Sequence, residues 1–304
     1  MALRSERGDG VPQSTRESDE AARRDAALGD VDWREPAPGQ SSSRFAAPSG
    51  SLAMVSAGDP AGERVLLVPG ATGSKEDFVL MLPLLAEAGF FAQSLDIAGQ
   101  YESGEAGPPP GEPYDWRLFV DDLIALLEDG GPAHLLGYSF AGIVAQLVAV
   151  ERPELLRSLA LLSTPPDAGN AFRTVKRIGA LSGLASPRVG AGLMIWGIVT
   201  NKNRVPPKRL DFVRSRFELT SRRSVDDMIG LMQDAPDLAP RLRELPLPKL
   251  VAVGSHDLWP LERHARFAER IGAELAVYET GHSPCETAPH QLVRDLLALY
   301  ARSR

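Results

Sequence analysis

Cysteine is almost absent from this chain of 304 residues, in which Cys285 is the only one. A single thiol forms no disulfide within the chain and builds no zinc site from cysteine ligands. Long apolar runs are absent too: none approaches the roughly 20 residues that span a bilayer, and the first residues lack the unbroken apolar stretch of a secretory signal. We therefore expect a cytoplasmic protein that does not insert stably into a membrane.

An excess of positive charge is also missing. With 33 Lys and Arg against 40 Asp and Glu, the formal net charge is -7 and the pI is near 5.4. A nucleic-acid partner is therefore not expected, because proteins of that class present basic surfaces. The composition, 43% hydrophobic and 24% charged, is that of a globular protein with a sizeable core.

Large apolar side chains are scarce in residues 1–43, which are rich in Arg, Glu, Asp, Ser, Gly and Pro. Ordering the backbone of one residue costs roughly 1 to 2 kcal/mol, whereas burying one large side chain returns about 2 kcal/mol. Only six such side chains are available here: Met1, Leu3, Val11, Leu28, Val31 and Trp33. We interpret residues 1–43 as a disordered tail.

Short aliphatic strands alternate with amphipathic helices in most of the remaining chain. Such alternation predicts an α/β fold with a mostly parallel, doubly wound sheet that helices cover on both faces. The core is assigned to residues 44–164 and 246–304. In sheets of this kind, ligands bind beyond the carboxyl ends of the strands.

Residues 165–245 interrupt the alternation with helix-like sequence that is rich in Gly and Pro. The interruption holds 14 Lys or Arg against 8 Asp or Glu, so it is positive while the rest of the chain is negative. We interpret it as an inserted helical cap, whose charge either lies on a solvated face or steers the substrate. Phe172 and Trp196 are candidate walls of a substrate pocket; the alternative is that these aromatic rings only hold the cap together.

Residues 135–142 read Leu-Leu-Gly-Tyr-Ser-Phe-Ala-Gly, which predicts a strand, a tight turn with Ser139 at its apex, and a helix. A serine hydroxyl becomes a nucleophile when a base takes its proton, and a sharp strand-to-helix turn lifts it toward such a base. The small residues Gly137, Ala141 and Gly142 let strand and helix pass closely. Ser139 is therefore the candidate nucleophile, although such short matches also occur at ordinary strand ends.

A candidate base and a candidate acid follow two later strands. Asp257 comes just after the strand 250–254, and His282 follows the strand 274–278. Because the carboxyl ends of neighbouring parallel strands meet at one edge of the sheet, we expect Ser139, Asp257 and His282 to form a catalytic triad. His282 would take the proton of Ser139, while Asp257 would orient the imidazole and stabilise its charged form.

Other residues compete for these roles. Asp167 also follows a strand, but it lies after two prolines at the start of the insertion, so Asp257 is favoured as the acid. His134 lies within a predicted core strand and is interpreted as a core residue. The other three histidines are interpreted as a support residue beside the acid (His256) and as surface positions on helices (His264 and His290).

Two backbone N–H donors are needed for the negative oxygen of a tetrahedral intermediate. One is the N–H of Phe140, directly after the nucleophile. The second is assigned to Ala71, with Thr72 as the alternative, in the glycine-rich loop after the first core strand. The same loop is also compatible with an ordinary strand-to-helix turn, and it lacks the spacing of a Walker phosphate loop.

Five motifs together resemble those of the α/β-hydrolase superfamily, over about residues 44 to 304. They are Pro69-Gly70-Ala71-Thr72-Gly73, Asp96-Ile97-Ala98-Gly99-Gln100, Gly137-Tyr138-Ser139-Phe140-Ala141-Gly142, Gly254-Ser255-His256-Asp257 and Gly281-His282-Ser283-Pro284. The resemblance implies a Ser-His-Asp triad, a helical cap between the sixth and seventh strands, and no cofactor. Pro69 and Ala141 depart from the usual pattern at the oxyanion loop and the nucleophile turn.

The function expected from these features is hydrolysis of a small-molecule carboxylic ester by a serine enzyme through an acyl-enzyme. Thioester, C–C bond and amide hydrolysis use the same triad and remain alternatives, as does a non-catalytic binding protein on the same fold. A serine nucleophile separates this chain from the dehalogenases and epoxide hydrolases of the superfamily, for which the resemblance implies an aspartate.

Overall fold

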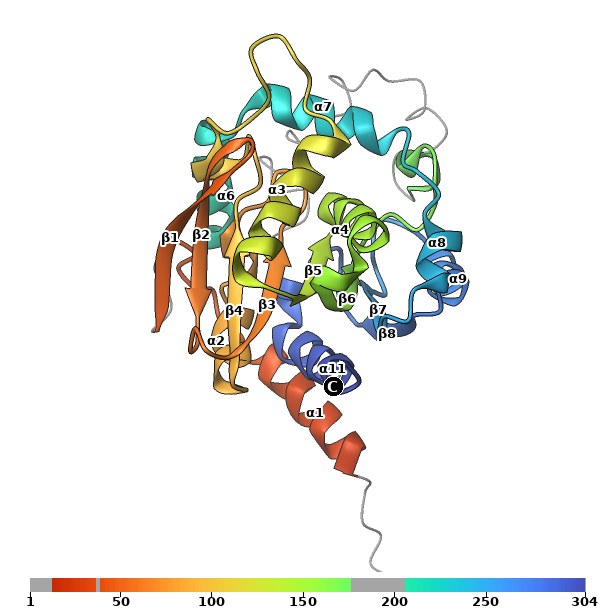
Figure 1. The fold of residues 1–304 in the computed structure, drawn as a ribbon. Coiled ribbons are helices and arrows are strands. Elements are labelled where there is room, and N and C mark those ends of the chain that lie inside the picture. The colour runs from red at the N-terminus through yellow and green to blue at the C-terminus, as the bar shows by residue number, and fades with distance from the viewer. Residues whose placement is uncertain (1–12, 37–38, 176–205, 304) are drawn as a thin grey trace, which may run out of the picture.

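A computed structural model describes residues 13–36, 39–175 and 206–303, and Figure 1 shows how their elements are arranged. Within these residues eight strands form one sheet, in the order β1-β2-β4-β3-β5-β6-β7-β8. The pairs β1/β2 and β2/β4 are antiparallel, and all other neighbours are parallel. The strands are β1 (Gln40–Ala47), β2 (Gly50–Ala57), β3 (Glu63–Val68), β4 (Phe90–Leu95), β5 (Ala133–Tyr138), β6 (Leu156–Leu162), β7 (Lys249–Gly254) and β8 (Glu274–Tyr278). The predicted mostly parallel α/β sheet is confirmed.

Helices pack on both faces of the sheet, as the aliphatic runs of the central strands require. Every residue of β5 and β7 is buried, because each side chain on either face meets a helix layer. One core layer joins the sheet to α3 (Trp116–Gly130), α4 (Phe140–Glu151), α8 (Ala239–Glu244) and α9 (Leu261–Ile271). The other layer joins it to α2 (Met81–Glu87) and α11 (Pro289–Ala301).

Between β6 and β7 the chain leaves the sheet and forms helical elements. The described ones are a 3₁₀ turn at Ala171–Thr174 (η4), α6 (Pro207–Leu219), α7 (Arg222–Met232) and α8. The start of α7 meets the loop after β4, since the N–H of Ser221 donates to the carbonyl of Gly99 at 2.8 Å. These elements belong to the segment 165–245 that the sequence predicted to be helical.

The N-terminal segment differs from the predicted disordered tail over residues 1–43. Helix α1 (Gln13–Ala26) lies beside α11 (Figure 1), and residues 40–43 already belong to β1. Asp25 is buried and accepts the backbone N–H groups of His290, at 2.8 Å, and Gln291, at 3.1 Å, at the start of α11. Trp33 is also buried, with the Arg209 guanidinium 4.3 Å from its ring centre.

The compositional argument counted only large apolar side chains and therefore missed polar anchors. An acid that accepts the free N–H groups of another helix stabilises that helix end, although it adds no apolar surface. None of the described helices combines the length and the apolar character needed to cross a bilayer.

Candidate active site

Ser139 lies at the turn between β5 and α4, with φ 52° and ψ -116°. A positive φ is unfavourable for a residue with a side chain, and it is tolerated where the surrounding packing enforces it. Here strand β5 and helix α4 approach so closely that a Cβ on Gly137 would lie 2.4 Å from the carbonyl oxygen of Ala141. The strained turn predicted around Ser139 is therefore present, and the next residue, Phe140, begins α4.

His282 and Asp257 lie at the carboxyl ends of β8 and β7, which pair in parallel. His282 Nε2 lies 3.2 Å from Ser139 Oγ, and His282 Nδ1 lies 2.5 Å from Asp257 Oδ1. Both separations are hydrogen-bond distances. The structure thus brings together the three residues that the sequence selected, in one chain of contacts from hydroxyl to imidazole to carboxylate.

Asp257 is only 2% exposed, yet it stays ionised. Burial alone would raise its pKa, but His282 and His264 outweigh burial through their hydrogen bonds and charge, and they lower the pKa to about 2. His264 donates from α9, where it is fully buried and not at the surface as the sequence predicted. That prediction was wrong because His264 shares the buried face of α9 with Phe267, Ala268 and Ile271.

Asp167, the alternative candidate for the acid, has other partners than His282. Its Oδ2 accepts a hydrogen bond from Arg263 Nη1 at 2.7 Å and contacts the Thr174 hydroxyl at 3.4 Å. His256, predicted to support Asp257, is exposed and pairs with Glu279 at 2.7 Å. Of the two candidate acids, only Asp257 is in contact with His282.

The glycine-rich loop at residues 69–74 passes directly beside Ser139. A Cβ placed on Gly70 would lie 3.0 Å from the Cβ of Ser139, so the loop backbone can approach Ser139 this closely only because Gly70 has no side chain. The N–H of Thr72 donates to Gln100 Oε1 at 2.9 Å and is therefore already used. In the described part of the chain, the N–H groups of Ala71 and Phe140 make no hydrogen bond, so Ala71 is the better of the two loop donors that the sequence left open.

Gln100 holds this loop from a fully buried position. Its Oε1 accepts the Thr72 N–H, while its Nε2 donates to Ser224 Oγ, on α7, at 2.9 Å. Thr72 has φ 63°, an unfavourable value that the bond to Gln100 helps to maintain. The sequence showed Gln100 within a motif but gave no sign of this contact, because its partners lie 28 and 124 residues away.

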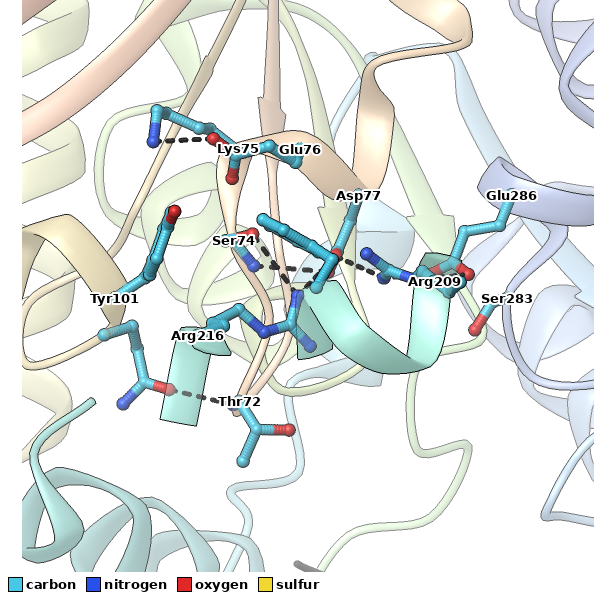
Figure 2. Close-up of polar contacts among 12 residues, drawn as sticks. Thr72, Ser74, Lys75, Glu76, Asp77, Tyr101, Arg209, Arg216, Ser283 and Glu286 are labelled. Atoms are coloured by element: carbon cyan, nitrogen blue, oxygen red, sulfur yellow. Dashed lines mark hydrogen bonds and ion pairs between the residues drawn. The ribbon is translucent and has the colours of Figure 1, made fainter. Parts of the chain in front are cut away.

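A cluster of four charged side chains lies next to the loop (Figure 2); Asp77, Arg209 and Arg216 are buried, and Glu286 is partly buried. Arg209 and Arg216, both on α6, contact the same oxygen of Asp77, Oδ1, at 2.7 and 2.8 Å. Arg209 also binds both carboxylate oxygens of Glu286, four residues after His282, and Arg216 donates to Ser74 Oγ at 3.3 Å. Helix α6 is thereby tied to the loop at residues 69–74 and to the segment that follows His282.

The charges of this cluster balance, with two guanidinium groups against two carboxylates. Burial would raise the pKa of Asp77, but Arg216 and Arg209 outweigh it and lower the pKa. For Glu286, burial outweighs Arg209 and the pKa is raised. Beside them, burial disfavours the Lys75 ammonium, but Asp96, Glu76 and Glu102 outweigh this and raise its pKa. We infer that α6 is held by ionic contacts as well as by apolar packing.

Aromatic side chains surround His282. The rings of Tyr138 and Trp259 lie 5.3 and 5.7 Å from the imidazole centre. Phe172, a predicted pocket wall, is half-buried on η4 and packs against the apolar core layer. The other predicted pocket wall, Trp196, lies outside the described residues. His134 is buried in β5, 2.8 Å from Ser158 Oγ, as a core histidine should be.

Comparison with known proteins identifies the family. The model of the alpha/beta hydrolase family matches residues 65–296, which is most of the chain. The chain belongs to this family. The segment that aligns with rat bifunctional epoxide hydrolase 2 covers 106 residues at 30% identity, which is 34% of this chain and 19% of the rat protein. Over 294 aligned residues the chain is 28% identical to polyketide synthase ThaQ of Burkholderia thailandensis, covering 83% of this chain and 14% of the synthase.

Solved structures share the fold. A hydrolase from Pseudomonas aeruginosa superposes with a TM-score of 0.69 at 22% identity, covering 85% of this chain and 97% of the other. The curated relatives named above are much longer than the matched part, since this chain covers only 14 to 19% of their length. Their activities therefore do not transfer to this chain without further argument.

Proposed function

We propose that this protein is a serine hydrolase that cleaves a carboxylic ester of a small molecule through an acyl-enzyme intermediate. The observation that carries the proposal is the contact chain from Ser139 Oγ to His282 Nε2, at 3.2 Å, and from His282 Nδ1 to Asp257 Oδ1, at 2.5 Å. A hydroxyl at a strained turn, a base within reach and a buried ionised acid are the parts that nucleophilic catalysis requires.

In the first half of the proposed reaction, Ser139 Oγ attacks the ester carbonyl carbon while its proton passes to His282 Nε2. The carbonyl oxygen becomes negative and is stabilised by the N–H groups of Phe140 and Ala71. The positive end of the α4 dipole adds to this stabilisation, because Ser139 directly precedes the helix. The intermediate collapses as the alcohol leaves with the proton from His282, and an acyl group remains on Ser139.

In the second half, a water molecule takes the place of the alcohol. His282 removes its proton, the resulting hydroxide attacks the acyl carbon, and the carboxylic acid leaves as Ser139 regains its proton. Asp257 stays ionised throughout, since its pKa is about 2. It keeps the proton of His282 on Nδ1, so that Nε2 is free to accept the proton of Ser139.

A nucleophile of this kind argues against epoxide hydrolysis, despite the partial match to an epoxide hydrolase. The superfamily's epoxide hydrolases are expected to use an aspartate at the nucleophile turn, where this chain has Ser139. Thioester and C–C bond hydrolysis need the same three residues and differ from ester hydrolysis in the substrate contacts, so a substrate panel has to separate them.

Labelling with a fluorophosphonate tests the proposal. We expect the wild-type protein to be labelled at Ser139 and to hydrolyse short-chain p-nitrophenyl esters, and we expect Ser139→Ala and His282→Ala to lose both activities. Removing a triad residue typically reduces kcat by about 10⁴- to 10⁶-fold. Ser94→Ala, which deletes another buried hydroxyl within the sheet, is the matched control and should remain active. An active Ser139→Ala protein would refute the mechanism.

We further propose that residues 165–245 form a cap that sets substrate preference. The support is their position between β6 and β7 and the contact of α7 with the loop after β4. Replacing Phe172 or Trp196 with Ala should change the ranking of ester substrates, since losing one wall of an apolar pocket alters discrimination by roughly 1 to 3 kcal/mol. A uniform loss over all substrates, together with a lower Tm, would instead assign these rings to packing.

A further inference from the structure

Asp257 has two imidazole partners, one on each carboxylate oxygen. His282 contacts Oδ1 at 2.5 Å, and His264 contacts Oδ2 at 2.9 Å. The backbone N–H of Trp259 also points to Oδ2, but at 3.5 Å it is at the limit of a hydrogen bond. His264 is therefore the main donor to the oxygen that faces away from His282.

The surroundings of His264 determine which of its nitrogens carries the proton. Its ring has no exposed surface, and Trp259 packs edge-on against it with ring centres 6.3 Å apart. Within the described residues, Nδ1 is buried and has no hydrogen-bond partner. A proton on Nδ1 would be a buried N–H without an acceptor, which is unfavourable, whereas a proton on Nε2 is accepted by Asp257.

A buried carboxylate can rotate about its terminal bond unless both oxygens are held. In this site the two oxygens need different partners, because Oδ1 has to face His282 Nδ1 for the imidazole to present Nε2 to Ser139. A fixed donor on Oδ2 sets the plane of the carboxylate and leaves only one orientation for Oδ1. His264, packed in α9 against the core, is such a donor.

We propose that His264 is a positioning residue of the catalytic site, which fixes Asp257 so that Asp257 in turn orients His282. This inference rests on the proposed serine-hydrolase function and goes beyond the three residues of the triad. The competing explanation is that His264 merely satisfies a buried carboxylate and stabilises the fold. The two differ in their predicted effect on kcat.

Three variants separate these explanations. His264→Phe keeps a ring of similar size but removes the donor, while His264→Gln restores an N–H at about the position of Nε2. His134→Phe is the matched control, since His134 is another fully buried histidine with a hydroxyl partner, Ser158, outside the site. Each protein is assayed well below its own Tm, with kcat, KM and the rate of fluorophosphonate labelling as readouts.

We expect His264→Phe to lower kcat and the labelling rate by roughly 10- to 100-fold, the scale known for losing a group that orients a metal-binding side chain. KM should stay within about twofold, because His264 has no exposed surface through which a substrate could reach it. His264→Gln should recover most of the rate, and His134→Phe should lower Tm without lowering kcat. If His264→Phe does not fold, His264→Asn, whose amide is too short to reach Asp257, takes its place.

Two results would overturn the inference while leaving the proposed function intact: unchanged kcat in folded His264→Phe, or equal losses in His264→Phe and His264→Gln. Failure of the proposed function has a different signature. In that case fluorophosphonate labels Ser139 neither in the wild-type protein nor in any of the His264 variants.

Discussion

On one side of Ser139, the groups that hold His282 come from a short part of the chain, whereas on the other side the loop 69–74 is held by groups from distant segments. His282, Asp257 and His264 all lie within 26 residues, around the ends of β7 and β8. The loop 69–74, which carries the proposed oxyanion donor Ala71, forms the oxyanion side. It is held by Gln100, and through Asp77 by two arginines more than 130 residues away.

The two sides also differ in their electrostatics. The histidine side has one buried carboxylate and two imidazoles, and its charge is stabilised by hydrogen bonds. The oxyanion side has buried guanidinium and carboxylate groups in balanced pairs (Figure 2). Because unpaired buried charges are strongly destabilising, removing one of these charged groups should affect folding more than chemistry. On the histidine side the reverse is expected.

Apart from substitutions of Ser139 and His282 themselves, the largest effect is expected from Asp257→Asn. This variant should reduce kcat by roughly 10³- to 10⁴-fold, because the neutral amide favours the wrong tautomer of His282. Asp167→Asn, the matched control, should change kcat by no more than a few-fold, since Asp167 contacts Arg263 and not His282. Steady-state ester hydrolysis measures both. If Asp167→Asn lowered kcat more than Asp257→Asn did, Asp167 and not Asp257 would be the acid.

The same carboxylate has a signature in the dependence of stability on pH. Its pKa is lowered in the folded state, to about 2, so the ionised form is stabilised by folding. This contribution is present in full above the ordinary aspartate pKa of about 3.9, and it is lost as the pH falls toward 2. Denaturant unfolding from pH 6 to pH 3 should therefore show a shallower loss of stability in Asp257→Asn than in the wild-type protein.

A smaller effect is expected on the oxyanion side from Gln100→Leu. The variant leaves Thr72 without its hydrogen-bond acceptor and frees the loop that carries Ala71. Misplacing one oxyanion donor costs up to about 10²- to 10³-fold in kcat, and we expect roughly a tenth of that here, because the donor itself remains. The control is Gln146→Leu, at another buried glutamine, whose Nε2 donates to the Gly142 carbonyl. Equal kcat values in the two variants would contradict a role for Gln100 in the loop.

The contrast between local and distant contacts explains which parts of the fold and of the site could be predicted from the sequence. Ser139, Asp257 and His282 were predictable because each follows a strand, and parallel strands bring their carboxyl ends together. The core strands β3 to β8 were predicted from the same alternation. β1 and β2 were missed: β1 begins with the polar run Gln40-Ser41-Ser42-Ser43, and the apolar run Leu52-Ala53-Met54-Val55 of β2 was not assigned to a strand.

The supporting residues were not predictable, for two physical reasons. Contacts such as Arg209 with Asp77 join residues 132 positions apart, and no local pattern of charge or periodicity marks their partner. His264 was misplaced because a buried histidine can be satisfied by a single acceptor, here Asp257, which lies seven residues earlier on a different element. The periodicity of the sequence indicates which face of a helix is apolar. It does not indicate which buried polar group from another part of the chain that face contacts.

Breaking the charge cluster should mainly affect stability. Arg209→Met leaves the Glu286 carboxylate, whose side chain is only 13% exposed, without its guanidinium partner, and removing one member of a buried pair typically costs about 3 to 5 kcal/mol. Because Asp77 retains Arg216, the double variant Arg209→Met/Glu286→Met should be more stable than the single one. Urea denaturation measures both, and kcat below the transition should fall only a few-fold. A double variant that is less stable than Arg209→Met would show that the pair is not the source of the loss.

The smallest effect is expected far from Ser139, at the contact of the N-terminal segment with α11. Asp25 accepts two backbone N–H groups at the start of that helix, from His290 and Gln291. Losing an acid that caps a helix costs typically about 1 kcal/mol, so Asp25→Ala should lower the denaturation midpoint measurably. Its kcat should stay within twofold of wild type, because α11 packs on one face of the sheet and contributes no residue to the triad.

Asp32→Ala, at an exposed aspartate of the same segment, is the control and should leave both the denaturation midpoint and kcat unchanged. If Asp25→Ala is as stable as Asp32→Ala, then the hydrogen bonds of Asp25 do not hold the segment in place, and apolar contacts such as those of Trp33 must do so.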